Sequence, residues 1–178
     1  MLKRGIHTPA HLLLDNTVYF ITSATYKKRK LLKSSLIKEH LIKTIADCLA
    51  EKQWQLNHWV ILDNHYHLLV KSHNASDMTK IFRKIHVLSA QFINKQLICE
   101  NPIWWNYWDY CPRNEQDYLI RLNYLFFNPI KHGYVTNLND YPFSSFHQFI
   151  ENQGRELVVH QFKTVKDYKK LDLDEDDF

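Results

Sequence analysis

Two histidines one residue apart are the first residues in this chain that suggest chemistry. His65 and His67 flank Tyr66 in an apolar segment typical of a β-strand. Side chains alternate along a strand, so both imidazoles would point to the same face and together hold a divalent metal ion. The chain has 11 histidines in 178 residues, so chance alone produces such a pair about as often as not. Packed or hydrogen-bonded histidines at a strand end therefore remain the alternative.

A tyrosine and an asparagine form the second candidate pair. Tyr124 and Asn128 are four residues apart in a segment with helical periodicity, so they share a helix face. Extending that face backwards adds Arg121 and Asp117, which predicts the polar stripe of an amphipathic helix. On such a stripe Tyr124 is predicted to be a surface residue, a platform for base stacking or a nucleophile.

One reaction uses all four of these side chains. A tyrosine oxygen can attack a DNA phosphodiester in line and form a phosphotyrosine bond. A metal ion on His65 and His67 would polarise a non-bridging phosphate oxygen. An amide oxygen suits a hard ion such as Mg²⁺ or Mn²⁺, so Asn128 is the expected third ligand, one helical turn from Tyr124.

Basic and aromatic residues supply a third set of candidates, this time for nucleic-acid binding. Phosphates need positive charge, and unpaired bases stack on aromatic rings. The alternative is solvated charge around an aromatic core. The candidates are Lys27, Lys28, Arg29, Lys30, Arg83, Lys84, Trp105 and Lys131.

The composition limits the class of protein. Hydrophobic residues make up 45% of the chain and charged residues 24%, as in soluble globular proteins. No apolar run is long enough for a membrane span. The three cysteines lack the spacing of a metal site and are typical of reduced thiols, so a cytoplasmic protein without membrane contact is expected. Five acids and no base lie in the tail 171–178, so the rest is more basic than the net charge of +4 indicates.

The elements that must position these residues follow an α+β order. Hydrophobic periodicity predicts strands at 17–25, 54–62, 66–71 and 102–110, and helices at 34–51, 76–97 and 115–128. Ser76 is the expected cap of the second helix, and Pro129 is expected to stop the third. This order predicts a ferredoxin-like antiparallel sheet with helices on one face, plus an added helix carrying Tyr124. Residues 1–150 are expected to form the domain, with an irregular segment at 134–150, and 151–178 a linker and acidic tail.

Three segments closely resemble the REP-associated tyrosine transposases, members of the HUH single-strand transposase superfamily. They are WVILDNHYHLLVKS at 59–72, WNYWDYCPRNEQDYLIRLNYLFFNPIKHGYV at 105–135 and DYPFSSF at 140–146. The family pattern is a strand ending in asparagine and His-x-His, followed by a helix with Tyr-x-x-x-Asn-Pro. The family often has a histidine where Cys111 stands. The resemblance covers residues 10–150 and implies an HUH transposase/endonuclease domain.

The resemblance also implies a mechanism and a substrate. Tyr124 would be the nucleophile, and His65, His67 and Asn128 would hold Mg²⁺ or Mn²⁺. The enzyme would cut single-stranded DNA near REP-like hairpins, link the 5′ phosphate to the tyrosine and leave a free 3′-OH. No nucleotide cofactor is expected.

Other interpretations stay open at this point. One is a hairpin DNA-binding protein in which catalysis is lost or unused. Another is an RNA-binding ferredoxin-like module, although such a module would carry aromatic residues in the middle of its central strands. A monomer and a homodimer, with the tyrosine helix of one chain against the histidines of the other, are both compatible with the sequence.

Overall fold

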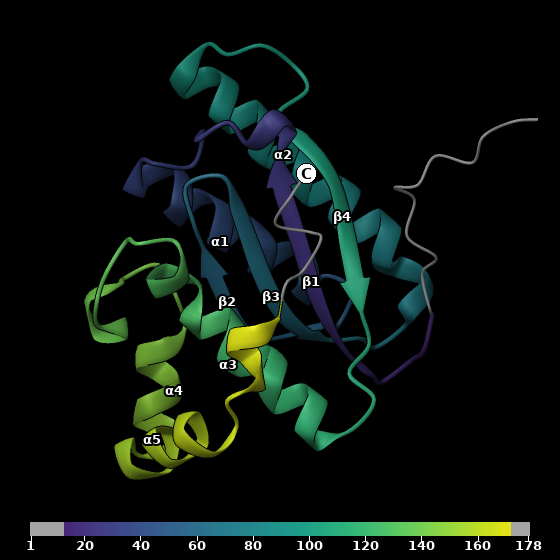
Figure 1. Ribbon diagram of the computed structural model, residues 1–178. Coiled ribbons are helices and arrows are strands. Elements are labelled where there is room, and N and C mark those ends of the chain that lie inside the picture. Colours follow the sequence, from purple (N-terminus) through teal and green to yellow (C-terminus); the bar gives the residue numbers. More distant parts are fainter. Residues whose placement is uncertain (1–12, 172–178) are drawn as a thin grey trace, which may run out of the picture.

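A single four-stranded antiparallel sheet is the centre of the computed structural model, which describes residues 13–171. The strands lie in the order β2-β3-β1-β4, with β1 and β3 in the middle (Figure 1). Their bounds are Val18–Thr25 for β1, Gln55–Ile61 for β2, His65–Lys71 for β3 and Trp104–Tyr110 for β4. The predicted ferredoxin-like α+β order is therefore confirmed.

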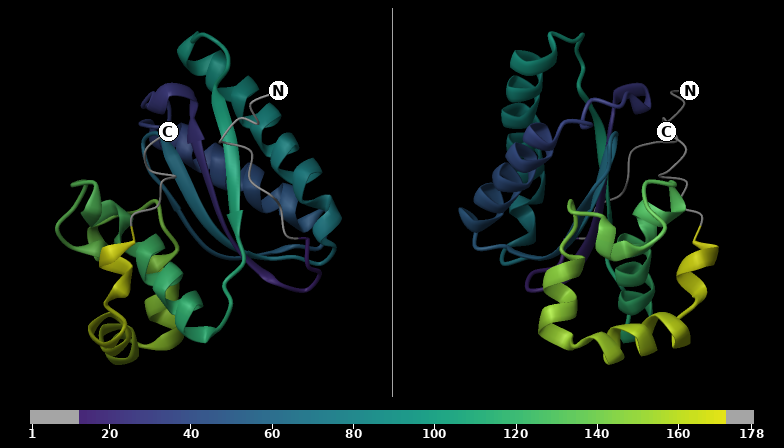
Figure 2. Two further views of the ribbon diagram at one scale, coloured as in Figure 1. Left: turned by 45° about the vertical axis from the view of Figure 1, so that its right-hand side comes forward. Right: turned by 90° about the vertical axis from the view of Figure 1, so that its left-hand side faces the viewer.

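Helices cover both faces of the sheet. Helices α1 (Ser35–Ala50) and α2 (Met78–Leu97) lie on one face, and α3 (Glu115–Lys131) lies on the other, as the edge-on view in Figure 2 shows. Strand alternation separates two cores. Leu68 belongs to the core under α1 and α2, whereas Leu69 belongs to the core shared with α3. The added helix thus lies on the face opposite the other two, a placement that the sequence did not specify.

The segment after α3 is more ordered than the sequence suggested. Helices α4 (Phe146–Gln153) and α5 (Arg155–Thr164) and a 3-10 turn, Asp167–Lys170, follow α3. Val158 and Tyr168 are buried in the core that α3 shares with the sheet. The expected linker after residue 150 is thus a packed part of the fold up to residue 171, because its apolar side chains complete that core. Residues 172–178 of the acidic tail lie outside the described residues.

Two expected helix boundaries were wrong. Helix α3 does not stop before Pro129 but continues to Lys131, with Pro129 inside its last turns. The start of α2 is preceded by a short 3-10 turn, where the side chain of Asn74 accepts a hydrogen bond from the Ser76 amide. Asn74 therefore caps this 3-10 turn, whereas α2 itself begins after Asp77, whose side chain makes no capping hydrogen bond.

None of the helices within residues 13–171 has the length and apolar character needed to cross a membrane.

Candidate active site

The two histidines lie on the sheet face that α3 covers. The register pairs His67 of β3 with Thr22 of β1, and His65 with Ala24. Both imidazoles are buried, and their ring centroids are 5.0 Å apart at an interplanar angle of 77°. The shared strand face brings the pair together, as the His-x-His spacing predicts.

Hydrogen bonds at Nδ1 orient both rings. His67 Nδ1 lies 2.7 Å from the Thr22 hydroxyl, and His65 Nδ1 lies 2.8 Å from Asn64 Oδ1. Asn64 Nδ2 donates to the Lys28 carbonyl at 3.4 Å, so its Oδ1 is the atom that accepts from His65. A neutral His65 protonated at Nδ1 presents the lone pair of Nε2, which is the form that binds a metal ion.

Tyr124 is buried against the histidines and is not a surface residue. Only 1% of it is exposed, and its ring centroid lies 5.5 Å from that of His67 and 6.2 Å from that of Phe20. Of the three alternatives that the sequence left open for Tyr124, the surface residue was therefore wrong. Arg121, on the same stripe, is also buried and lies over the Tyr110 ring, 3.9 Å from its centroid. The polar stripe of α3 faces the sheet because the sheet presents polar residues there.

Asn128 is the third member of the arrangement. It is fully buried, and its Nδ2 donates to the Tyr124 carbonyl at 2.9 Å. Its Oδ1 is buried with no hydrogen-bond partner among the described residues. An unsatisfied buried amide oxygen is unfavourable unless something else, such as a cation, compensates for it. Two imidazoles and this oxygen fit a divalent cation. Within residues 13–171, no site for a metal ion is formed by three or more histidine, cysteine, aspartate or glutamate side chains alone.

The end of α3 adds two residues that sequence reasoning did not place here. Lys131 Nζ donates a hydrogen bond to Tyr124 Oη at 3.1 Å. The His132 ring lies 5.1 Å from that of His65, centroid to centroid. The seven-residue spacing between Tyr124 and Lys131 was a usable signal, since seven residues are almost two helical turns. The expected stop at Pro129 concealed it.

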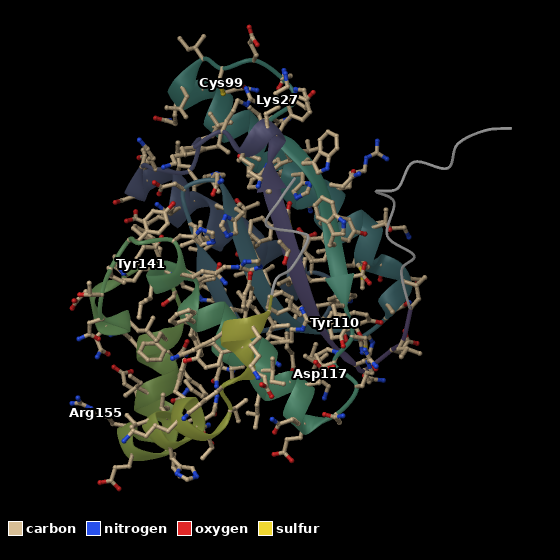
Figure 3. The ribbon with its side chains drawn as sticks, in the orientation of Figure 1. Lys27, Cys99, Tyr110, Asp117, Tyr141 and Arg155 are labelled. Atoms are coloured by element: carbon tan, nitrogen blue, oxygen red, sulfur yellow. The ribbon has the colours of Figure 1, made fainter. Side chains whose placement is uncertain are left out.

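Contacts at its other end hold α3 in place. The Tyr110 hydroxyl, at the end of β4, donates to Asp117 Oδ2 at 2.7 Å, and Figure 3 shows these two residues side by side. Asn114 caps the helix by accepting from the Asp117 amide at 2.9 Å. The tyrosine helix is thereby attached to the edge strand of the sheet.

The basic run, residues 27–30, lies at the same end of the sheet as His65. Thr25, at the end of β1, donates its amide to the Asn64 carbonyl at 2.8 Å, and Lys27 follows at that end (Figure 3). Lys27 and Lys30 are exposed. The Arg29 guanidinium instead donates to the carbonyls of Tyr26, Glu100 and Pro102. Arg29 is therefore a brace between two loops.

The remaining predicted DNA-binding residues are divided between two places. Trp105 is 37% exposed and stacks on Tyr26 at 5.3 Å between ring centroids. With Arg83 it lines a cavity of about 480 Å³ between α2 and β4. Lys84 forms an ion pair with Glu51 at 2.6 Å on the face formed by α1 and α2. The structure does not bring Lys84 to the tyrosine.

Comparison with known proteins defines the class of protein. Residues 14–111 match the family described as Transposase IS200 like, which is more than half of the chain. The chain therefore belongs to the IS200-like transposase family, and the protein is an enzyme, a transposase. The match covers the four strands with α1 and α2, and it ends before α3.

Individual proteins that are similar to the chain indicate a narrower group within this family. The chain is 29% identical over 163 residues to a putative REP-associated tyrosine transposase of Haemophilus influenzae, covering 84% of each. It is 28% identical over 143 residues to the REP-associated tyrosine transposase of Escherichia coli K12, covering 78% of this chain and 81% of the relative. The solved structure of a REP-associated tyrosine transposase bound to a REP hairpin superposes with a TM-score of 0.67 at 25% sequence identity. The match covers 80% of this chain and 84% of the chain in that structure. The resemblance seen in the sequence is confirmed.

Proposed function

We propose that the chain is a metal-dependent single-strand DNA endonuclease and strand transferase that acts near palindromic hairpin DNA. The observation that carries this proposal is the contact of Tyr124 with His67, with Asn128 one helical turn further on. The relative bound to a REP hairpin supports hairpin DNA as the partner. The free thiols of Cys48, Cys99 and Cys111 support a reducing, cytoplasmic location.

The proposed reaction exchanges one phosphodiester bond for another. The Tyr124 oxygen attacks phosphorus, the bond to the 3′ oxygen breaks, and the phenol proton is replaced overall by one on the new 3′-OH. The 5′ phosphate stays on Tyr124. Attack by another 3′-OH reverses these bond changes and joins strands without an external energy source.

His65, His67 and Asn128 would hold the metal ion, and transposases of this type are generally metal dependent. A bound Mg²⁺ or Mn²⁺ supplies Lewis-acid polarisation of the phosphate. The chain itself orients the two imidazoles through Thr22 and Asn64. Since Tyr124 and His67 of one chain are in contact, a site complete within a monomer is favoured over one shared between two chains.

The proposed contacts to DNA lie around this site. Lys27, Lys28 and Lys30 would bind backbone phosphates next to the histidines, and Trp105 with Arg83 would contact an unpaired base. Arg29 would stabilise the loop that carries these lysines, because its guanidinium donates to backbone carbonyls.

A covalent adduct is the decisive test. The full chain is incubated with single-stranded hairpin DNA and Mn²⁺, denatured and examined for protein linked to a 5′ phosphate. Mass spectrometry should place the nucleotide on the peptide that contains Tyr124. Hairpin binding without any adduct at any metal concentration would instead support the alternative, a binding protein without catalysis.

A further inference from the structure

The end of α3 places a positive charge on the proposed nucleophile. Lys131 Nζ donates to Tyr124 Oη at 3.1 Å and lies 4.9 Å from the centroid of its ring. The lysine is exposed as a residue, but its amine reaches inward to a phenol that is almost fully buried. This contact requires α3 to continue through Pro129, because Lys131 is the last residue of the helix.

A hydrogen bond from an ammonium group changes what the phenol oxygen can do. The attack on phosphorus requires the oxygen to lose its proton, and a nearby cation that donates a hydrogen bond stabilises the charged oxygen. The same oxygen is the leaving group when strands are rejoined. A donor fixed at this atom therefore acts on both directions of the reaction.

We propose that Lys131 is a catalytic residue, which holds the Tyr124 oxygen and stabilises its negative charge during cleavage and rejoining. This role rests on the proposed function of Tyr124. It differs from that of a lysine that binds backbone phosphate, because its contact is with the reacting atom. Lys131 accepts no proton in this step; the phenol proton is balanced by the one gained at the released 3′ oxygen.

A lysine that binds phosphate and a lysine that donates to the nucleophile predict different experimental results. A phosphate contact contributes to affinity, and its loss lowers the slope of binding against salt by about 0.7 for single strands. A donor to the nucleophile contributes to the rate once DNA is saturating. Its loss is expected to slow adduct formation about 100-fold, the effect of removing one preorganised donor.

Three variants of the full chain separate these roles. Lys131→Met keeps the length of the side chain without its charge, Lys131→Arg keeps the charge, and Lys95→Met removes an exposed lysine of α2 as a matched control. Hairpin affinity is measured across a salt series. The single-turnover rate of adduct formation is measured with saturating DNA and Mn²⁺, and the rejoining rate is measured from isolated adduct. Thermal unfolding reports whether each variant is folded.

Lys131→Met should slow cleavage and rejoining by similar factors while the salt slope stays that of the parent chain, and Lys131→Arg should recover a large part of the rate. Lys95→Met should leave both the salt slope and the rate at saturation as they are in the parent chain. A normal rate in a folded Lys131→Met, or a loss confined to affinity, would overturn the role of Lys131. A parent chain that forms no adduct would instead refute the proposed function.

Discussion

Thr22 and His67 are paired across the two central strands, with the threonine hydroxyl 2.7 Å from the imidazole Nδ1. Thr22 is 1% exposed and His67 is fully buried, so the contact is shielded from water. It orients the ring that also contacts Tyr124, with 5.5 Å between centroids. A residue on β1 thus helps to position His67, the proposed metal ligand on β3, beside the tyrosine on α3.

Replacing Thr22 by valine tests this arrangement. The change keeps the shape and removes the hydroxyl, so His67 loses the group that orients it. Loss of such a partner typically costs 10- to 100-fold in metal affinity or activity, and we expect about 10-fold in the Mn²⁺ concentration that half-activates cleavage. Thr44→Val is the control, because that hydroxyl donates to the His40 carbonyl on α1. Equal Mn²⁺ requirements for both variants would contradict the role of Thr22.

Removing the imidazoles should separate cleavage from binding. The variants His65→Ala and His67→Ala are expected to abolish cleavage, whereas hairpin affinity falls little because it depends on many phosphate contacts. Both quantities are measured on the same hairpin DNA, by gel analysis of products and by fluorescence anisotropy. If the double variant cut DNA at the parent rate, the metal assignment would be wrong.

The nucleophile is tested by Tyr124→Phe. The ring stays in contact with Phe20 and His67, so the free energy of unfolding should change only by the lost hydrogen bond, about 1 kcal/mol. The variant should bind hairpin DNA and form no covalent adduct. Tyr118→Phe, on the same helix, is the control and should form adduct normally. An adduct that persists in Tyr124→Phe would place the nucleophile elsewhere.

Salt dependence locates the DNA surface. Neutralising Lys27, Lys28 and Lys30 together should lower the slope of log affinity against log salt by about 2, at about 0.7 per contact. Arg29 is left intact because its guanidinium holds three backbone carbonyls. A control variant neutralises Lys43, Lys80 and Lys95, which are exposed on α1 and α2. Equal slopes for the two triple variants would place the DNA surface away from the basic run.

Acid should destabilise the fold through a half-buried histidine on α2, His86. Burial lowers the pKa of His86 to about 3, and its Nε2 lies 2.9 Å from the Ser23 hydroxyl. Below about pH 6.5 the unfolded chain binds a proton there that the folded chain does not, so stability falls as pH falls toward 3. The contribution is up to about 1.4 kcal/mol per pH unit. Urea unfolding at several pH values should give a shallower dependence for His86→Gln; an unchanged dependence would contradict this prediction.

Strand alternation and helical periodicity were sufficient to predict the four strands, the order of strands and helices along the chain, and the shared face of His65 and His67. They were not sufficient for α3. Tyr124, Arg121 and Asn128 are polar, and polarity predicts exposure, but here they lie against polar groups on the sheet. Periodicity reports which residues share a face; it does not report whether that face is exposed or buried in the folded chain.

Two further features depend on tertiary contacts that a local pattern does not contain. Pro129 predicts the end of a helix, yet α3 continues to Lys131. The segment from Arg155 to Leu171 is rich in charged residues, which is typical of a linker. Val158 and Tyr168 of this segment are nevertheless buried in the core beneath α3. Both are decided by the partners available after the chain has folded.

The Arg29 brace has a consequence for how the protein meets its substrate. Its guanidinium joins the turn after β1 to the loop before β4, two segments more than 70 residues apart in the chain. The backbone of the basic run is therefore held in one conformation before any DNA strand binds. A surface ordered in advance loses less conformational entropy on association than a flexible loop would, so more of the energy of each proposed phosphate contact would remain as affinity.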